Sequence, residues 1–318
     1  MSVGKFALLL AALPLLAACS DKPQQGDANA NAPATARPAA PVSPASAHQA
    51  GTDQDGSRMD DHSQNAAAIA PPKPSQVLEA IYQKDSHGQD AMAIANGSEA
   101  KYWYGYAFEL QGKHYYTGFA YDTPDKFGKQ DEETTPAPNA KVTLTQATFE
   151  LAKDAAAPGW SLLESERFIG EFGSFEKADA IDDQVKAQGA ATADGRLLLA
   201  VPTWYLASGS RIKSFSLFVY RPTPSDDPDD TSWTYLGTIP RGEDNGAACD
   251  ADGSGNHVPC VTGAGTLSFV PADKGLPELR VALAGTGIDD AGQKKTYGAA
   301  DAATYRFNPQ SKVYEAAK

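Results

Sequence analysis

Alternation of hydrophobic and polar positions is clearest between Tyr102 and Tyr121, where it predicts a β-hairpin. A two-residue turn at Gln111-Gly112 makes one face aromatic, with these opposed pairs: Phe108 with Tyr115, Tyr106 with Thr117, Tyr104 with Phe119, and Tyr102 with Tyr121. The other face is mostly small, with these pairs: Glu109 with His114, Ala107 with Tyr116, Gly105 with Gly118, and Trp103 with Ala120. A slip of one residue would mix the two faces, so the pattern predicts this register.

Most apolar segments after residue 140 also have the length and composition of strands. They cover residues 142–151, 197–201, 212–220, 233–239, 266–270, 279–283, and a terminal hairpin of 305–307 with 313–314. Residues 197–201 are almost continuously apolar, as expected of a strand covered on both faces.

Two short helices are also expected. The first starts at Pro74-Ser75 and places Val77, Leu78 and Ile81 on one side, and the second runs from Lys177 to Lys186. The predicted fold class is therefore mainly β, with antiparallel sheets in a propeller-like arrangement or a large sandwich, and one or two short helices.

Three segments share one form, an aromatic strand followed by a polar turn and a strand that an aromatic residue begins or closes. They are residues 149–151 with Trp160, 215–217 with Trp233, and 305–307 with Tyr314. Repeated antiparallel units of this kind favour a propeller or a large sandwich.

The first residues have the layout of a secretory signal, with the single cation Lys5 followed by an apolar run from Phe6 to Ala18. A membrane-spanning helix needs about 20 such residues, so this run is too short to be one. The run ends in Leu16-Ala17-Ala18-Cys19, which resembles the lipobox of bacterial lipoproteins. The alternative is an ordinary signal peptide that contains a cysteine.

The lipobox resemblance implies that residues 1–18 are removed and that Cys19 is diacylated, which anchors the chain to a membrane. Ser20, which is not an aspartate, follows the cysteine. By the same resemblance, this favours the outer membrane, with the protein facing the periplasm and surface display left open. Residues 19–74 are rich in Ala, Pro, Asn, Gln and Ser, with almost no large apolar side chains, so they are expected to form a disordered tether. Residues 75–318 form the globular β-rich part.

The chain has 27 Lys and Arg against 40 Asp and Glu, a net charge of −13. Loss of residues 1–18 removes only Lys5, which leaves 26 cations and 40 anions and a net charge of −14. This charge argues against binding nucleic acid or an anionic lipid surface. It permits a cationic protein partner, although solubility alone would also account for it.

Two cysteines, Cys249 and Cys260, remain after Cys19. An even number of cysteines in an exported protein favours a disulfide, and this one would close a loop worth just under about 3 kcal/mol. The alternative is a pair of free thiols.

Between these cysteines lies Asp250-Ala-Asp252-Gly-Ser254-Gly-Asn256, which resembles the start of an EF-hand loop. The resemblance implies calcium ligands at Asp250, Asp252, Ser254 and Asn256, because alternate oxygen donors would face a hard cation. The twelfth position is Val261 where the EF-hand has a glutamate, so an Asp/Gly turn closed by the disulfide is the alternative.

Other patterns compatible with ligand binding or catalysis each have a structural alternative. The aromatic hairpin offers Trp103 and Tyr116 as a platform for sugar rings, or as core residues. Glu164 with Glu166 or Glu171 has the residue types of a glycosidase pair, or of solvated strand-edge acids. Ser174-Phe-Glu-Lys177 matches the Ser-x-x-Lys pattern of penicillin-recognising enzymes, whose chemistry requires a buried helix, and the residues after it read as a surface helix.

The segments 265–269, 273–283, 285–287 and 305–307 resemble one blade of envelope β-proteins. Some lipoproteins of this general type inhibit secreted cell-wall hydrolases. The sequence contains no complete motif of a known catalytic site, which favours binding over catalysis. We therefore expect a non-catalytic outer-membrane lipoprotein that binds a protein partner, as an inhibitor or immunity protein would. The alternative is a binding protein or hydrolase that acts on peptidoglycan or another carbohydrate.

Overall fold

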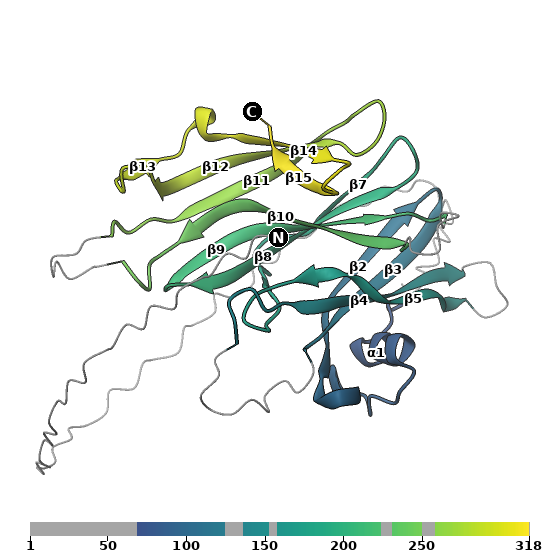
Figure 1. Ribbon diagram of the computed structural model, residues 1–318. Helices are drawn as coiled ribbons and strands as arrows, with labels where there is room; N and C mark the ends of the chain where they lie inside the picture. The colour runs from purple at the N-terminus through teal and green to yellow at the C-terminus, as the bar shows by residue number, and fades with distance from the viewer. Residues whose placement is uncertain (1–68, 125–135, 153–157, 224–230, 250–257, 318) are drawn as a thin grey trace, which may run out of the picture. The chain divides into compact units, whose positions relative to one another are not determined.

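Three antiparallel sheets, formed one after another along the chain, make up the computed structural model, which describes residues 69–124, 136–152, 158–223, 231–249 and 258–317. The predicted mainly β fold with antiparallel sheets is confirmed (Figure 1). All described residues belong to one compact unit, Asn65–Lys318.

The first sheet has the strand order β1-β2-β3-β4-β5 and carries the main helix on one face. Its elements are α1 (Pro74–Tyr82), β1 (Ala91–Ala93), the 3-10 turn η1 (Ala95–Gly97), β2 (Glu99–Leu110), β3 (Lys113–Asp122), β4 (Val142–Ala152) and β5 (Gly159–Phe172).

The second sheet has the order β10-β9-β8-β6, with β7 also paired to β8. Its strands are β6 (Ala180–Ile181), β7 (Gln188–Ala191), β8 (Leu197–Ala207), β9 (Ser210–Tyr220) and β10 (Trp233–Asp244).

The third sheet has the order β11-β12-β14-β15, with β13 paired to β12. Its elements are β11 (Gly263–Val270), β12 (Glu278–Ile288), β13 (Lys294–Thr296), the 3-10 turn η2 (Ala299–Asp301), β14 (Ala303–Asn308) and β15 (Val313–Ala316). The three units of the proposed repeat are antiparallel hairpins, one in each sheet: β4 with β5, β9 with β10, and β14 with β15.

The second sheet is apolar on both faces, as predicted for residues 197–201. Side chains of Leu197, Leu199 and Val201 pack with the first sheet, whereas Leu198 and Ala200 pack with the third. Complete burial of both faces explains why this segment lacks the alternation of a half-exposed strand.

Helix α1 covers the small-residue face of the first sheet. It starts at Pro74 as predicted, and Val77, Leu78 and Ile81 are buried against that face. A Cβ on Gly118 would overlap with Val77, so a residue without a side chain is required where the helix approaches the sheet.

The predicted hairpin register is confirmed from the turn out to the pair Tyr104 with Phe119, but not beyond it. A β-bulge at Trp103 puts Tyr102 opposite Ala120 and Lys101 opposite Tyr121, so the predicted pairs of Trp103 with Ala120 and of Tyr102 with Tyr121 are wrong. The bulge turns Trp103 toward the second sheet, where its ring centroid lies 6.0 Å from that of Phe218 on β9. The same ring packs against Phe172 at the end of β5, with centroids 4.9 Å apart.

The predicted helix from Lys177 to Lys186 is wrong. This segment contains the short strand β6, which pairs with Thr203 and Trp204, and then a turn in which Asp182 N donates to Pro202 O. The side chain of Asp182 pairs with the buried Arg241. These tertiary contacts decide the backbone here, and the three aspartates of the segment favour a helix only weakly.

Candidate functional site

A strained turn joins the end of β5 to the second sheet. Ser174 N donates to Lys177 O at 3.0 Å, and Lys177 N donates back to Ser174 O at 2.9 Å. Between them, Phe175 and Glu176 have φ values of 52° and 57°, both left-handed. Type I′ turns require this backbone and normally use Asn-Gly, so an aromatic residue followed by a glutamate is costly here, by about 1 kcal/mol or more for each residue.

This turn contains the Ser-x-x-Lys pattern. Ser174 and Lys177 face each other across a reverse turn, so the buried helix that serine acylation chemistry requires is not present there.

The surroundings hold the turn in its strained form. Glu176 N donates to Ala140 O at 2.8 Å, and the Glu176 side chain is buried. Gly173, at φ 78°, has no room for a side chain because a Cβ would overlap with Lys177 O. With Glu176 directed inward, Phe175 remains at the surface with 41 % of its area exposed.

Phe175 lies at the edge of a cleft of about 480 Å³ formed by four separate segments of the chain. The lining residues are Pro138, Lys141, Glu171, Phe172, Gly173, Ser174, Phe175, Asp179, Tyr205, Leu206, Ala207, Tyr235, Gly237 and Thr238. Three of them, Phe175, Tyr205 and Leu206, are large hydrophobic residues that are exposed, with Leu206 at 63 %. Exposed apolar side chains gathered around one concavity mark binding sites more often than scattered ones do.

Asp179 is the buried acid of this cleft, with 7 % of its area exposed. Its backbone carbonyl accepts a hydrogen bond from Trp103 Nε1 at 2.8 Å. Its carboxylate makes no hydrogen bond to any residue that the structure describes. Burial raises the pKa of Asp179 from 3.8 to about 6, because the charged form loses its hydration.

Four other ionisable side chains line the cleft with Asp179. Glu171 and Lys141 line the cleft and are both exposed, while Tyr205 and Tyr235 contribute phenol rings. Burial, together with the nearby Asp179 charge, raises the pKa of Tyr235, so this phenol stays neutral. The cleft therefore contains two acidic side chains, Asp179 and Glu171, and one basic side chain, Lys141.

The acid pair singled out from the sequence lies elsewhere, between the first sheet and the start of β10. Glu166 accepts hydrogen bonds from Ser232 N at 2.6 Å, Trp233 N at 3.2 Å and Gln146 Nε2 at 2.9 Å. Glu164 accepts one from Ser232 Oγ at 2.5 Å, and burial raises its pKa. Both acids thus link β5 to the start of β10 by hydrogen bonds. Glu171 is not part of this group and lines the cleft.

The structure does not bring Trp103 and Tyr116 together. Trp103 packs between the first and second sheets, and Tyr116 is buried under α1 on the opposite face of the first sheet. Tyr116 OH is hydrogen-bonded to Tyr102 OH at 2.9 Å. The two rings therefore share no exposed platform.

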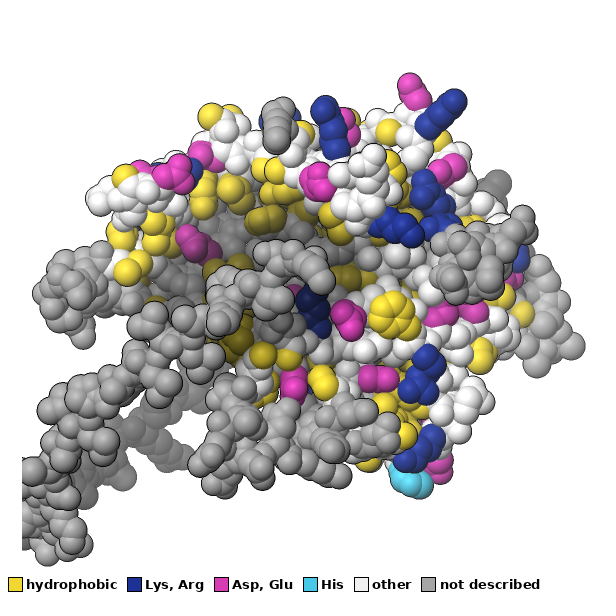
Figure 2. All heavy atoms as spheres, viewed as in Figure 1, with side chains coloured by type: hydrophobic (Ala, Val, Ile, Leu, Met, Phe, Trp, Pro, Cys, Tyr) yellow, Lys and Arg dark blue, Asp and Glu magenta, His cyan; other side chains and the backbone are white. Residues whose placement is uncertain are grey.

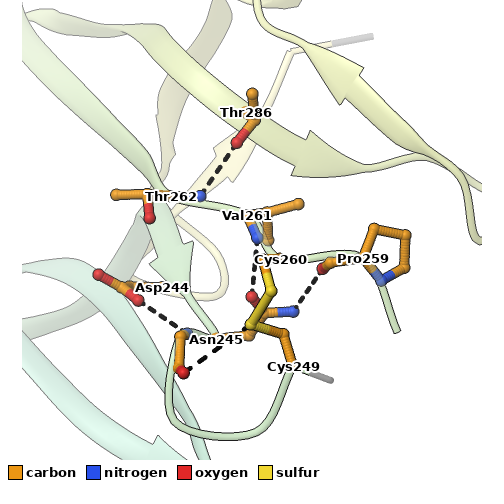
Figure 3. The surroundings of a disulfide bond; sticks show 9 residues. Asp244, Asn245, Cys249, Pro259, Cys260, Val261, Thr262 and Thr286 are labelled. Carbon is orange, nitrogen blue, oxygen red and sulfur yellow. Dashed lines mark hydrogen bonds between the residues drawn. A yellow bond between two sulfur atoms is a disulfide. The ribbon is translucent and has the colours of Figure 1, made fainter. Parts of the chain in front are cut away.

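The predicted disulfide between Cys249 and Cys260 is confirmed (Figure 3). It lies just beyond β10 and before β11, where Asn245 Nδ2 donates to Pro259 O at 2.9 Å and Val261 N donates to Asn245 Oδ1 at 2.8 Å. The bond and these amide contacts fix the connection between the second and third sheets.

Several predicted site residues lie outside the described residues: Cys19 and the four proposed calcium ligands Asp250, Asp252, Ser254 and Asn256. Within the described ranges, no group of three or more His, Cys, Asp or Glu is arranged to hold a metal ion. No helix in the same ranges is long and apolar enough to cross a bilayer.

Charge alone does not mark a site on the face shown in Figure 2. Among the described residues of that face, acidic and basic side chains are interspersed and form no single charged field. Comparison with protein-family models, curated proteins and solved structures gives no match to this chain. The cleft around Asp179 is therefore the candidate functional site.

Proposed function

We propose that this chain is a non-catalytic lipoprotein of the outer membrane that binds a cationic protein through the cleft around Asp179. The main support for this proposal is that three large hydrophobic side chains, Phe175, Tyr205 and Leu206, are exposed around one cleft. Residues 1–19 support the anchored location through their resemblance to a lipobox.

The strain at Phe175 supports a binding role. A glycine or asparagine would adopt φ 52° with less strain. The aromatic residue therefore makes the fold less stable than a turn with glycine or asparagine would. Such strain tends to occur where a side chain must be presented to a ligand. Large aromatic side chains are also the residue type that dominates the energy of protein interfaces.

The charge of the chain favours a basic partner. The net charge of −14 that remains without residues 1–18 would attract a cationic protein over a distance, and the two carboxylates of the cleft would then meet it locally. Glu166 is held by backbone N–H groups at the start of β10, and one oxygen of Glu164 accepts a hydrogen bond from Ser232 Oγ. This engagement favours binding over glycan hydrolysis by that pair.

The test begins with a photo-cross-linking amino acid placed at Leu206 in the full chain, produced in its own cells. A matched chain carries it at Val270, which is also exposed but lies at the end of β11, outside the cleft. We expect a discrete adduct with a basic protein from position 206 and none from position 270. Equal adducts from both positions, or none from 206, would overturn the proposal.

The cross-linked protein is then purified, and its affinity is measured for the unmodified chain, for Leu206→Ser and for Val270→Ser. Loss of a buried leucine contact should weaken binding about tenfold, and added salt should weaken it further. The Val270→Ser chain should bind as the unmodified one does. An affinity that is insensitive to both Leu206→Ser and salt contradicts the proposed surface.

Membrane attachment is tested separately by mass spectrometry of the purified chain. We expect a mature N-terminus at Cys19 carrying acyl groups, and we expect processing to stop when lipoprotein signal peptidase is inhibited. An unmodified N-terminus would refute the anchor while leaving the cleft to be judged by cross-linking.

A further inference from the structure

We propose that the cleft receives one Lys or Arg side chain of the partner, whose charged group pairs with the carboxylate of Asp179. This inference rests on the proposed function and goes further, because it assigns the central contact of the interface. It follows from how Asp179 differs from two other largely buried aspartates, Asp182 and Asp122.

Two other largely buried aspartates have their partners within the chain. Asp182 pairs with the buried Arg241, and Asp122 accepts hydrogen bonds from Tyr82 OH and from Arg167. A buried carboxylate without such a partner is costly, which explains why these two are paired. Asp179 is more than nine-tenths buried and has no hydrogen-bond partner for its carboxylate among the described residues, yet it lines an open cleft.

The lining of the cleft suits a long cationic side chain. Tyr205 and Phe175 lie at its exposed edge, and Tyr235 and the buried Phe172 lie deeper, with their ring centroids 6.1 Å apart. Lys and Arg side chains lay their aliphatic stems along apolar surface, and their charged ends are attracted to aromatic faces. An aromatic lining with one buried acid thus matches both parts of such a side chain.

The remaining charges of the cleft make opposite contributions. Glu171 adds a second carboxylate that favours an incoming cation, and Lys141 opposes it. Both side chains are exposed, so each should change the affinity less than Asp179 does. Replacing Lys141 by Gln should strengthen cation binding, and replacing Glu171 by Gln should weaken it.

The experiment titrates the purified full chain with N-acetyl-arginine amide and N-acetyl-lysine amide, and with the uncharged N-acetyl-citrulline amide as control. Binding is followed by NMR shifts of the tyrosine and phenylalanine rings. We expect millimolar binding of at least one cation and about tenfold weaker binding of citrulline, since the citrulline amide lacks the charge. Equal binding of citrulline and arginine would overturn the inference.

Two variants locate the binding. Asp179→Asn should weaken binding of the cation about tenfold, whereas Asp183→Asn, which removes an exposed charge four residues away, should leave it within about twofold. The unmodified chain supplies an independent readout if Asp179→Asn folds poorly. Its affinity should rise between about pH 5 and pH 7 as Asp179 ionises. The other ionisable side chains that line the cleft are Glu171, Lys141, Tyr205 and Tyr235. A flat pH profile, or unchanged binding by Asp179→Asn, contradicts the assignment.

The two proposals fail in different ways. A partner whose affinity responds to Leu206→Ser, while no cationic probe binds, would reject the Asp179 contact and keep the docking surface. Specific binding of the cationic probe without any cross-linked protein would keep the Asp179 contact and reject the protein partner.

Discussion

Asp179→Asn should stabilise the folded chain at neutral pH, although it removes a charge. The pKa of Asp179 is 3.8 in an exposed environment and about 6 in the folded chain. Each pKa unit corresponds to about 1.4 kcal/mol, so keeping this carboxylate ionised in the folded state costs roughly 3 kcal/mol above both pKa values. The amide of asparagine has nearly the same shape and carries no charge, so it avoids this cost.

The sign of the effect follows from proton binding. Between about pH 4 and pH 6 the folded chain holds the Asp179 proton more tightly than the unfolded chain does, so stability falls as the pH rises. The stabilisation by Asp179→Asn should therefore be about 3 kcal/mol at about pH 7.5 and only about 1 kcal/mol at about pH 4.5. The Asp179 charge also contributes to the raised pKa of Tyr235, but this phenol stays neutral at both pH values and so adds nothing to the comparison.

Thermal unfolding at the two pH values measures this difference. For a folded part of this size, each kcal/mol moves the midpoint by about 2 to 4 °C, so Asp179→Asn should melt roughly 5 to 10 °C higher at about pH 7.5. Asp183→Asn, at an exposed position, should change the stability by less than about 0.5 kcal/mol. A lower melting temperature for Asp179→Asn at neutral pH, or the same increase at both pH values, would refute the idea that Asp179 is an uncompensated buried acid.

Three further predictions concern other parts of the fold. Glu166→Ala leaves two backbone N–H groups at the start of β10 without their acceptor, so the free energy of unfolding in urea should fall by about 2 to 4 kcal/mol. The control Glu109→Ala, at an exposed position, should lower it by less than about 0.5 kcal/mol, and equal losses would contradict this role of Glu166. Replacing both Cys249 and Cys260 by alanine should lower the urea midpoint by an amount equivalent to at most about 3 kcal/mol, and a midpoint that does not move would mean that the loop is held by its hydrogen bonds alone. Phe175→Asn should raise thermal stability by about 0.5 to 1 kcal/mol because asparagine tolerates the left-handed backbone, and a destabilised variant would show that the ring is worth more to the fold than its strain costs.

The parts of the fold that could be predicted from the sequence are those set by local pattern. The helix at Pro74 has a proline start and a clear apolar side, and the hairpin register follows from its opposed aromatic residues. The prediction failed at Trp103 because a bulge depends on what the ring meets across the sheets. It failed at residues 177–186 because pairing with β8 decides the backbone there.

The cleft could not be predicted, because its lining comes from four segments spread over about a hundred residues, as far apart as Pro138 and Thr238. Only one local signal pointed to it. Phe175 is an aromatic residue between Ser174 and Glu176, two residues after Gly173, and lies outside the strands predicted from the sequence. An apolar side chain in a polar turn indicates exposure, but the sequence does not tell which distant residues surround it.

The order of the sheets along the chain affects how the protein must fold. Each sheet comes from a continuous stretch of chain, so its strands meet with little loss of loop entropy and can pair early. The second sheet cannot be stable by itself, because both of its faces are hydrophobic. Leu199 and Phe218 lie on one face, and Leu198 and Leu217 lie on the other. A chain cut short before β11 would leave that second surface bare, so an incomplete product should aggregate instead of persisting as a smaller soluble protein.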